Sequence, residues 1–164
     1  MQPQTRCGWQ NNAMAGNTRA YAARSDIVAP LSRVWDALTQ TSDVERWMSK
    51  GSRVVARAGG SFSGSLDRRF RFSAHIDVFD SHRRIRLVHL PPENVPRFEG
   101  AVIDDILIDV RDDKTILRVL GSNFPRAEEY GSFYMVRQLG WRQALARLKV
   151  YLENNMDKLP EKNP

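Results

Sequence analysis

The sequence predicts an α+β protein: a curved antiparallel β-sheet of about seven strands wraps around one long C-terminal helix, with two short helices after the first strand. Three observations lead to this fold class. Near the N-terminus the hydrophobic period changes from strand-like to helical, most of the middle alternates in short segments joined by turns, and the end is helical. Strands joined by short turns pair antiparallel, and only the last helix is long enough to cover the sheet.

The N-terminal part carries one strand and two helices. Residues 18–28 alternate as a strand, with this inward face: Tyr21, Ala23, Ser25 and Ile27. Residues 29–40 carry an apolar stripe at helical spacing. A second short helix follows at residues 41–49, where Ser42 and Glu45 have the spacing of a capping box.

The middle of the chain alternates in six segments that read as strands: residues 52–57, 61–66, 69–79, 84–90, 101–110 and 115–121. Gly59 and Gly60 form the first turn, and Pro91 and Pro92 end the fourth segment. The last two segments form a hairpin across residues 111–114. The segment from about Ala127 to Met156 is the long helix. One domain therefore spans residues 18–157, between an N-terminal tail at 1–17 and a C-terminal tail at 158–164.

Composition excludes several kinds of site. The formal charge is +6, from twenty Arg and five Lys against 19 acidic residues, but the basic residues are spread without a long run. This pattern indicates ordinary solvated charge, so we do not expect a nucleic-acid partner. A single cysteine, Cys7, excludes an internal disulfide and a cysteine-based metal site. The sequence shows neither a secretory signal nor a membrane-length apolar segment, so we expect a cytoplasmic protein with no cofactor and no metal.

Five segments carry a family resemblance: IVAPLSRVWDALT from Ile27, VERWM from Val44, GGSFSG from Gly59, FDSHRRIRLVH from Phe79 and GWRQALARLKVYLE from Gly140. In this order and spacing they resemble the START-like superfamily, also called SRPBCC. Within it the chain is most similar to the bacterial family related to the C-terminal domain of the activator of the ninety-kilodalton heat-shock protein ATPase. The resemblance covers residues 18–155 and implies a helix-grip fold with a cavity between the sheet and the helix.

The chain departs from the family pattern in two places. The segment SLDRRFRFSAH at residues 65–75 is basic and has no glycine, and residues 89–92 stand where the family often has a tryptophan. Both departures fall where ligand specificity is expected. The resemblance therefore carries no particular ligand over to this chain.

The inward stripe of the long helix has two halves around Trp141. On its C-terminal side helical spacing aligns three leucines: Leu145, Leu148 and Leu152. On its N-terminal side the aligned residues are polar or aromatic: Gln138, Tyr134 and Tyr130, with Arg137 beside them. Leucines against a sheet form a dry core, whereas a buried polar group needs a partner. We therefore expect the N-terminal half to face a cavity, or else a partly wet edge that binds nothing.

The function favoured by this pattern is binding of a small, largely hydrophobic ligand between the sheet and the C-terminal helix. The lining candidates are Trp35, Trp47, Phe62, Phe72, Leu87, His89, Tyr134, Gln138 and Trp141. Aromatic side chains supply contact area, while Gln138 and His89 orient a polar end of the ligand. The hypothesis predicts a closed apolar pocket of roughly a few hundred Å³.

Two alternative functions remain open. One is a co-chaperone-like protein-interaction module, which the resemblance implies; Leu139 and Val150 point outward from the long helix, and the protein is a monomer or a homodimer. The other is a cyclase or hydrolase of a hydrophobic substrate that uses His89 and Asp104, although a shift of register would turn Asp105 inward instead. No catalytic residue is predicted otherwise, and the histidines lack metal-ligand spacing. An enzyme is the less favoured interpretation.

Basic residues alternate on two predicted strands. Arg69, Arg71 and His75 share the outer face of one strand, and Arg84 and Arg86 share that of the next. Antiparallel pairing is expected to gather them into one basic patch. Because no aromatic residues are interleaved for base stacking, a solvated sheet face is favoured over a binding surface.

Overall fold

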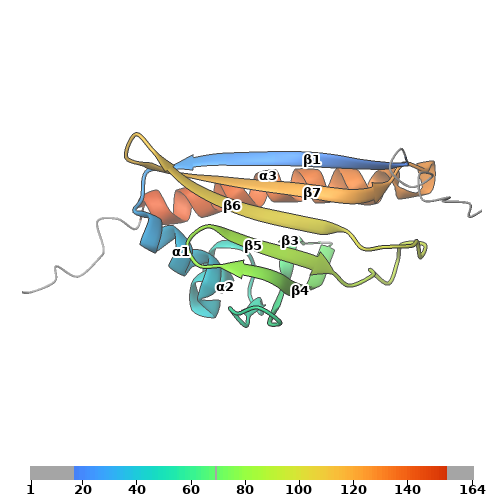
Figure 1. Ribbon diagram of the computed structural model, residues 1–164, viewed down its shortest axis with the longest axis horizontal. Coiled ribbons are helices and arrows are strands. Elements are labelled where there is room, and N and C mark those ends of the chain that lie inside the picture. The colour runs from blue at the N-terminus through green and yellow to red at the C-terminus, as the bar shows by residue number, and fades with distance from the viewer. Residues whose placement is uncertain (1–16, 69, 155–164) are drawn as a thin grey trace, which may run out of the picture.

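A computed structural model of the chain describes residues 17–68 and 70–154 and confirms the α+β fold class. Seven strands form one antiparallel sheet in the order β1-β7-β6-β5-β4-β3-β2. The strands are β1 (Thr18–Ile27), β2 (Arg53–Val54), β3 (Ser61–Asp67), β4 (Phe70–Asp80), β5 (Arg84–His89), β6 (Ile103–Arg111) and β7 (Lys114–Pro125). The helices are α1 (Leu31–Thr39), α2 (Thr41–Trp47) and α3 (Gly131–Asn154), and α3 follows a short 3₁₀ turn, η1 (Glu128–Tyr130). Figure 1 shows the curved sheet lying along α3, with α1 and α2 near the C-terminal end of that helix.

Alternation along the strands buries one face of the sheet, as the sequence predicts. All four expected inward residues of β1 are buried: Tyr21, Ala23, Ser25 and Ile27. In β6 the register turns Asp104 inward and leaves Asp105 on the outer face. The β6–β7 hairpin turns through Asp112 and Asp113, both at positive φ (50° and 60°), which is the backbone of the turn that matches strand twist.

The helix α3 packs its C-terminal half against the sheet through buried leucines: Leu145, Leu148 and Leu152. Gly140 is buried beside Leu66 of β3, and a Cβ added at Gly140 would lie 3.0 Å from the Leu66 Cβ. Close approach of α3 to β3 therefore explains the missing side chain. Across residues 17–68 and 70–154, no helix is long and apolar enough to cross a membrane.

Three local predictions differ from the structure. The strand expected at residues 52–57 is only two residues long, because the chain turns away through Gly59 at φ +76°. The expected capping box is wrong: α2 begins with Gln40 as its N-cap, without a side-chain cap, and Glu45 accepts a hydrogen bond from the Gly51 amide instead. The long helix begins at Gly131 rather than near Ala127. Its predicted end at Met156, the tail around Cys7 and the tail at 158–164 lie outside the described residues.

The register separates the arginines of the expected basic patch, and His75 of β4, opposite Val88 of β5, lies between them. On β4, Arg71 lies opposite Ser65 of β3 and beyond the paired part of β5, whereas Arg86 lies opposite Val78. At about 3.3 Å per residue, this places the two arginines roughly 20 Å apart along the sheet. Arg84 and Arg86 instead both pair with Asp105 at 2.8 and 3.0 Å. Arg69 lies outside the described residues.

Candidate functional site: a buried polar network beside a loop-covered pocket

A row across three strands brings a tyrosine to a buried aspartate. Tyr21 of β1 lies opposite Gly121 of β7, and Gly121 lies opposite Asp104 of β6. A Cβ at Gly121 would lie 2.2 Å from Cζ of Tyr21, so the tyrosine ring lies directly over the glycine. The hydroxyl of Tyr21 thereby reaches Oδ1 of Asp104 and donates a hydrogen bond of 2.5 Å. Because Gly121 has no side chain, the Tyr21 ring can cross β7 and contact Asp104 on β6, which is not its neighbouring strand.

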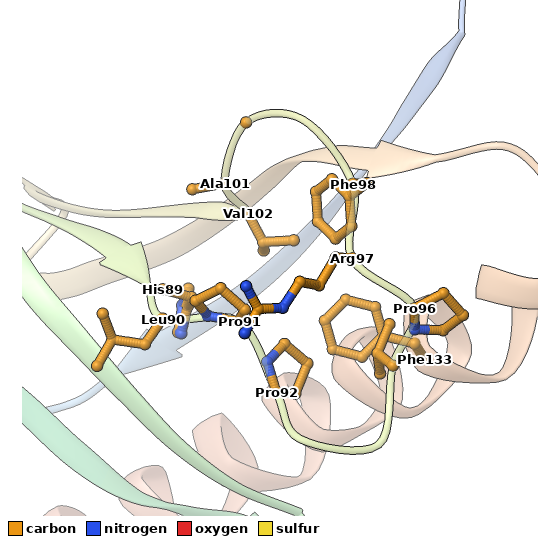
Figure 2. Close-up of a pocket in the computed structure, with 12 residues that line it drawn as sticks. His89, Leu90, Pro91, Pro92, Pro96, Arg97, Phe98, Ala101, Val102 and Phe133 are labelled. Atoms are coloured by element: carbon orange, nitrogen blue, oxygen red, sulfur yellow. The ribbon is translucent and has the colours of Figure 1, made fainter.

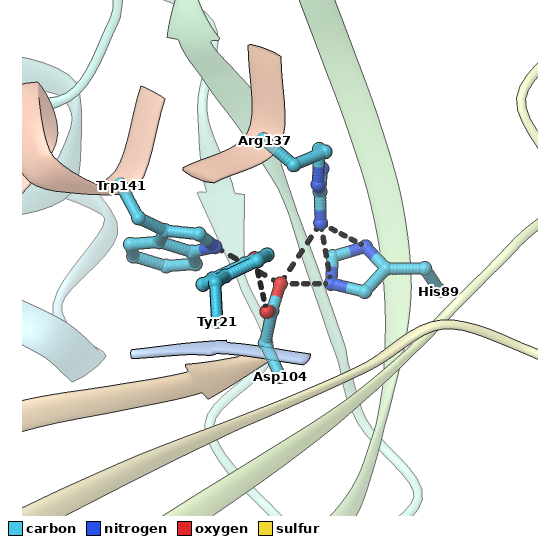
Figure 3. A network of polar contacts seen from close by, with 5 residues as sticks. All are labelled: Tyr21, His89, Asp104, Arg137 and Trp141. Carbon is cyan, nitrogen blue, oxygen red and sulfur yellow. Dashed lines mark hydrogen bonds and ion pairs between the residues drawn. The ribbon is translucent and has the colours of Figure 1, made fainter. Parts of the chain in front are cut away.

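Three further donors converge on the other oxygen of the Asp104 carboxylate, as Figure 3 shows. Oδ2 accepts from Nε2 of His89 at 2.7 Å, from Nη2 of Arg137 at 2.9 Å and from Nε1 of Trp141 at 3.0 Å. The carboxylate is fully buried, and His89, Arg137 and Trp141 are each less than a tenth exposed. We call Tyr21, His89, Asp104, Arg137 and Trp141 the Asp104 network.

The charges within the Asp104 network are fixed by these contacts. Burial opposes ionisation of Asp104, but the contacts with His89, Arg137 and Tyr21 outweigh burial and hold the pKa of Asp104 below its ordinary value. Burial, then the charge of Arg137, lower the pKa of His89 to about 4, although Asp104 acts in the opposite direction. Burial and the negative charge of Asp104 raise the pKa of Tyr21. At neutral pH the network holds an ionised aspartate, a charged arginine, a neutral histidine and a neutral tyrosine.

This charge state also decides the imidazole tautomer. An ionised carboxylate 2.7 Å from Nε2 of His89 requires the ring proton on Nε2. Nδ1 is then an acceptor, and Nη2 of Arg137 lies 3.0 Å from it and 2.7 Å from Nε2. The guanidinium carbon of Arg137 also lies 5.3 Å from the centre of the Phe72 ring. Among the described residues, Nε of Arg137 is buried without a hydrogen-bond partner.

A pocket of about 190 Å³ lies on the other side of His89. It is covered by the loop from Leu90 to Val102, the thirteen-residue connection between β5 and β6. Most of the lining is apolar: Pro91, Pro92, Val95, Pro96, Phe98, Val102 and Phe133. Figure 2 shows Pro91, Pro92, Phe98 and Val102 around the space enclosed by the loop, with Phe133 contributed by α3. His89 belongs both to this lining and to the Asp104 network.

The structure places most of the sequence-predicted lining residues elsewhere. Four are core residues that do not line this pocket: Trp35, Trp47, Phe62 and Leu87. Trp35 packs on Phe79 at a centroid distance of 5.2 Å, and Nε1 of Trp47 donates to the Ala37 carbonyl. Trp141, another lining candidate, donates its Nε1 proton to Asp104 and does not line the pocket.

Of the remaining predicted residues, Phe72 and Tyr134 pack against members of the Asp104 network. Phe72 packs on His89 with centroids 5.4 Å apart, and Tyr134 donates to the Ala20 carbonyl at 2.8 Å. Gln138 is half-buried on α3. Of the nine candidates, only His89 lines the pocket, while the pairing of His89 with Asp104 that the enzyme hypothesis requires is present.

Local sequence patterns do not reveal the walls of the pocket, because they identify residues 90–102 only as a connection between two strands. One signal was available: adjacent antiparallel strands need only a few linking residues, and thirteen residues with three prolines exceed that need. Tyr21 was assigned to the core face, and nothing in a single sequence shows that it reaches past Gly121. Arg137 was placed beside the inward stripe without a partner.

The Asp104 carboxylate and the ring nitrogens of His89 all contact other members of the Asp104 network. In residues 17–68 and 70–154, no cluster of three or more His, Cys, Asp or Glu side chains could hold a metal ion. Asp104 already accepts from four donors, and both ring nitrogens of His89 face network partners. The arrangement fixes the orientation of His89 at the inner end of the pocket.

Comparison with known proteins gives a family and a fold. The model of the family described as Activator of Hsp90 ATPase homolog 1-like protein matches residues 28–153. Curated protein sequences give no match. Among solved structures, protein MLL2253 from Mesorhizobium loti has a TM-score of 0.70 and 20% identity, over 83% of this chain and 98% of that one. The Aha1 dimer from Colwellia psychrerythraea has a TM-score of 0.70 and 17% identity, over 84% and 98%. CalU16 from Micromonospora echinospora has a TM-score of 0.66 and 22% identity, over 88% and 79%.

Proposed function

Since the chain belongs to the family of Activator of Hsp90 ATPase homolog 1-like proteins, whose START-like fold is compatible with ligand binding, we propose that it binds a small, largely apolar molecule in the pocket beneath the 90–102 loop. One observation carries the proposal. The pocket has apolar walls on nearly every side and a single buried polar residue, His89, at its inner end. Apolar walls with a few placed polar groups are typical of sites for small molecules.

The loop that covers the pocket is restrained, which indicates that the pocket is already formed before a ligand binds. Pro91, Pro92 and Pro96 restrict the backbone of the loop, because the proline ring fixes φ. Tyr130 holds the loop from η1, with its hydroxyl donating to the Arg97 carbonyl at 3.3 Å and its ring packing edge-on against Phe98. A preformed pocket avoids part of the ordering entropy that binding otherwise loses.

In this proposal the Asp104 network positions His89 and has no catalytic role. Asp104 binds the Nε2 proton and Arg137 contacts the ring from the side of α3, so the imidazole cannot rotate without breaking buried hydrogen bonds. Each such loss leaves a buried polar group unpaired, which costs about 1–3 kcal/mol. The His89 ring therefore presents a contact surface of fixed orientation to the ligand.

The proposal is tested with indole, a neutral probe of about the pocket's size. Amide shifts of Val95, Phe98 and Gly100 in two-dimensional NMR spectra should change on titration. Filling the space with Ala101→Phe should weaken binding by about tenfold or more. The matched control, Ala22→Phe on the exposed outer face of β1, should bind as the wild type does. Absence of shifts in the wild-type loop, or an Ala101→Phe variant that binds indole normally, would contradict the proposal.

A second candidate function, a protein-interaction module, is favoured by the outer side of α3. Three apolar side chains there are more than half exposed: Met135, Leu139 and Val150. The first two lie four residues apart, so they share one side of the helix. A pull-down with the ninety-kilodalton chaperone, comparing the wild type with Leu139→Glu, tests this candidate. Capture by the wild type alone would support it, and no capture by either would count against it.

A further inference from the structure

We propose that the pocket selects small anionic ligands, in which a single ring or short branched chain carries a carboxylate, and that Arg97 is the residue that selects them. The inference rests on the proposed function, because it names the chemistry of the ligand for the same pocket. It is carried by the position of the Arg97 side chain, the charge of the lining and the volume of the pocket.

Arg97 reaches into the space that the loop encloses. Its side chain lines the pocket, although the residue is exposed overall and so remains accessible from solvent. Figure 2 shows the side chain pointing across the loop, with the guanidinium turned toward Pro91 and away from Phe133. The bond from the Tyr130 hydroxyl to the Arg97 carbonyl anchors the backbone from which this side chain extends. The guanidinium is therefore presented to the pocket from an anchored point.

The lining carries one permanent positive charge and no negative charge. Of its twelve residues, Arg97 alone carries a permanent charge, and none is an aspartate or a glutamate. Among the interactions of residues 17–68 and 70–154, no ion pair joins the Arg97 side chain to a carboxylate, whereas Arg84 and Arg86 each have one. Glu99, the nearest acidic residue along the chain, lines a neighbouring hollow instead.

The two sides of the pocket favour different parts of a ligand. Phe98 and Phe133 offer apolar contact on one side, and the Arg97 guanidinium faces the other. His89 is neutral and its Nε2 proton is bound by Asp104, so it adds no charge that would replace Arg97 as the anion's partner. A carboxylate matches the planar fork of a guanidinium with two parallel hydrogen bonds.

The volume limits the size of the ligand. An apolar cavity of roughly 150 Å³ is large enough to hold benzene. The present pocket of about 190 Å³ therefore holds one ring with a small charged substituent. A long acyl chain or a body of three or more fused rings exceeds this volume. Size and charge together point to a class such as monocyclic aromatic carboxylates.

The test compares 4-methylbenzoate with 4-methylbenzamide, a neutral probe of nearly the same shape, by titration calorimetry at neutral pH and constant salt. The wild type should bind the carboxylate about tenfold more tightly than the amide. Arg97→Gln should lose that preference by weakening the carboxylate alone, and Arg97→Lys should retain part of it. The matched control, Arg142→Gln on the exposed side of α3, changes the net charge equally and should preserve the preference.

The outcomes separate this inference from the proposed function. Equal binding of both probes by the wild type would overturn the role of Arg97 while leaving the pocket a binding site. Equal weakening of both probes in Arg97→Gln would show that Arg97 shapes the pocket without selecting charge, which also overturns the inference. Failure of both probes to bind the wild type would overturn the inference together with the proposed function.

Discussion

Asp104 determines the arrangement of the residues at the inner end of the pocket. Its carboxylate accepts hydrogen bonds from Tyr21, His89, Arg137 and Trp141, which come from β1, β5 and α3. A buried carboxylate is tolerated only when it is paired and hydrogen-bonded, and here every donor is itself buried. The loss of one donor should therefore be felt in stability, and the loss of charge should be felt more strongly.

Removing one hydroxyl from the Asp104 network tests its contribution to stability. Tyr21→Phe keeps the ring over Gly121 but leaves Oδ1 of Asp104 without its 2.5 Å donor. We expect the free energy of unfolding to fall by about 1–3 kcal/mol, measured by urea denaturation. Tyr134→Phe is the matched control, because the Tyr134 hydroxyl donates to an exposed backbone carbonyl. A Tyr21→Phe loss no larger than the control's would show that the contact contributes little.

The histidine of the network predicts a pH dependence of stability. The pKa of His89 falls from 6.5 to about 4 in the folded state, so folding favours the neutral ring. Between pH 6.5 and about pH 4 the unfolded chain binds a proton at His89 that the folded chain does not bind. The free energy of unfolding therefore falls as the pH falls through this range. The loss should amount to roughly 1–3 kcal/mol between the two values.

The lowered pKa of Asp104 adds a second loss in stability at lower pH, below the ordinary range of a carboxyl group. Denaturation curves at several pH values separate the two groups. In His89→Gln the free energy of unfolding should stay nearly constant between pH 6.5 and about pH 4, while the loss at lower pH should remain. His75→Gln, at an exposed position on β4, should keep the wild-type profile. An unchanged loss between pH 6.5 and about pH 4 in His89→Gln would contradict the assigned charge state.

At the scale of elements, two glycines allow strands and helices to approach one another closely. Gly121 lets a residue of β1 reach β6 across β7, and Gly140 lets α3 approach Leu66 of β3. The sequence predicted the strand alternation, the β6–β7 hairpin and the aliphatic half of α3, because these follow local periodicity. It did not predict the pairing of Tyr21 with Asp104 or the register that separates Arg71 from Arg86, because strand order and register are long-range properties.

Gly140→Ala gives opposite predictions for an isolated helix and for this fold. Alanine favours a helix interior by about 1 kcal/mol relative to glycine. The new Cβ would lie 3.0 Å from the Leu66 Cβ, an atom held close to the β3 backbone. Overpacking of this kind typically destabilises a core by about 1–3 kcal/mol, so we expect a lower melting temperature. A higher melting temperature would show that α3 and β3 are free to move apart.

At the scale of the whole molecule, the fold separates a dry core from a ligand-sized space. Near the C-terminal end of α3, its leucines pack against the sheet and form the dry core. The buried side chains of the Asp104 network occupy the space between the sheet and the middle of α3. The 90–102 loop encloses the pocket beside Phe133. The sequence predicted that the two halves of α3 would differ. It counted Trp141 among the lining residues, but Trp141 is bound to Asp104 instead, because buried hydrogen bonding across strands cannot be read from one element.

The central claim is that the space beneath the 90–102 loop binds a small, largely apolar molecule, and intermolecular nuclear Overhauser effects with bound indole test it most directly. Cross-peaks from the indole ring to protons of Val95, Val102 and Phe133 are the predicted result, since these side chains line the pocket. Cross-peaks confined to the outer side of α3, at Met135 and Leu139, would contradict the claim.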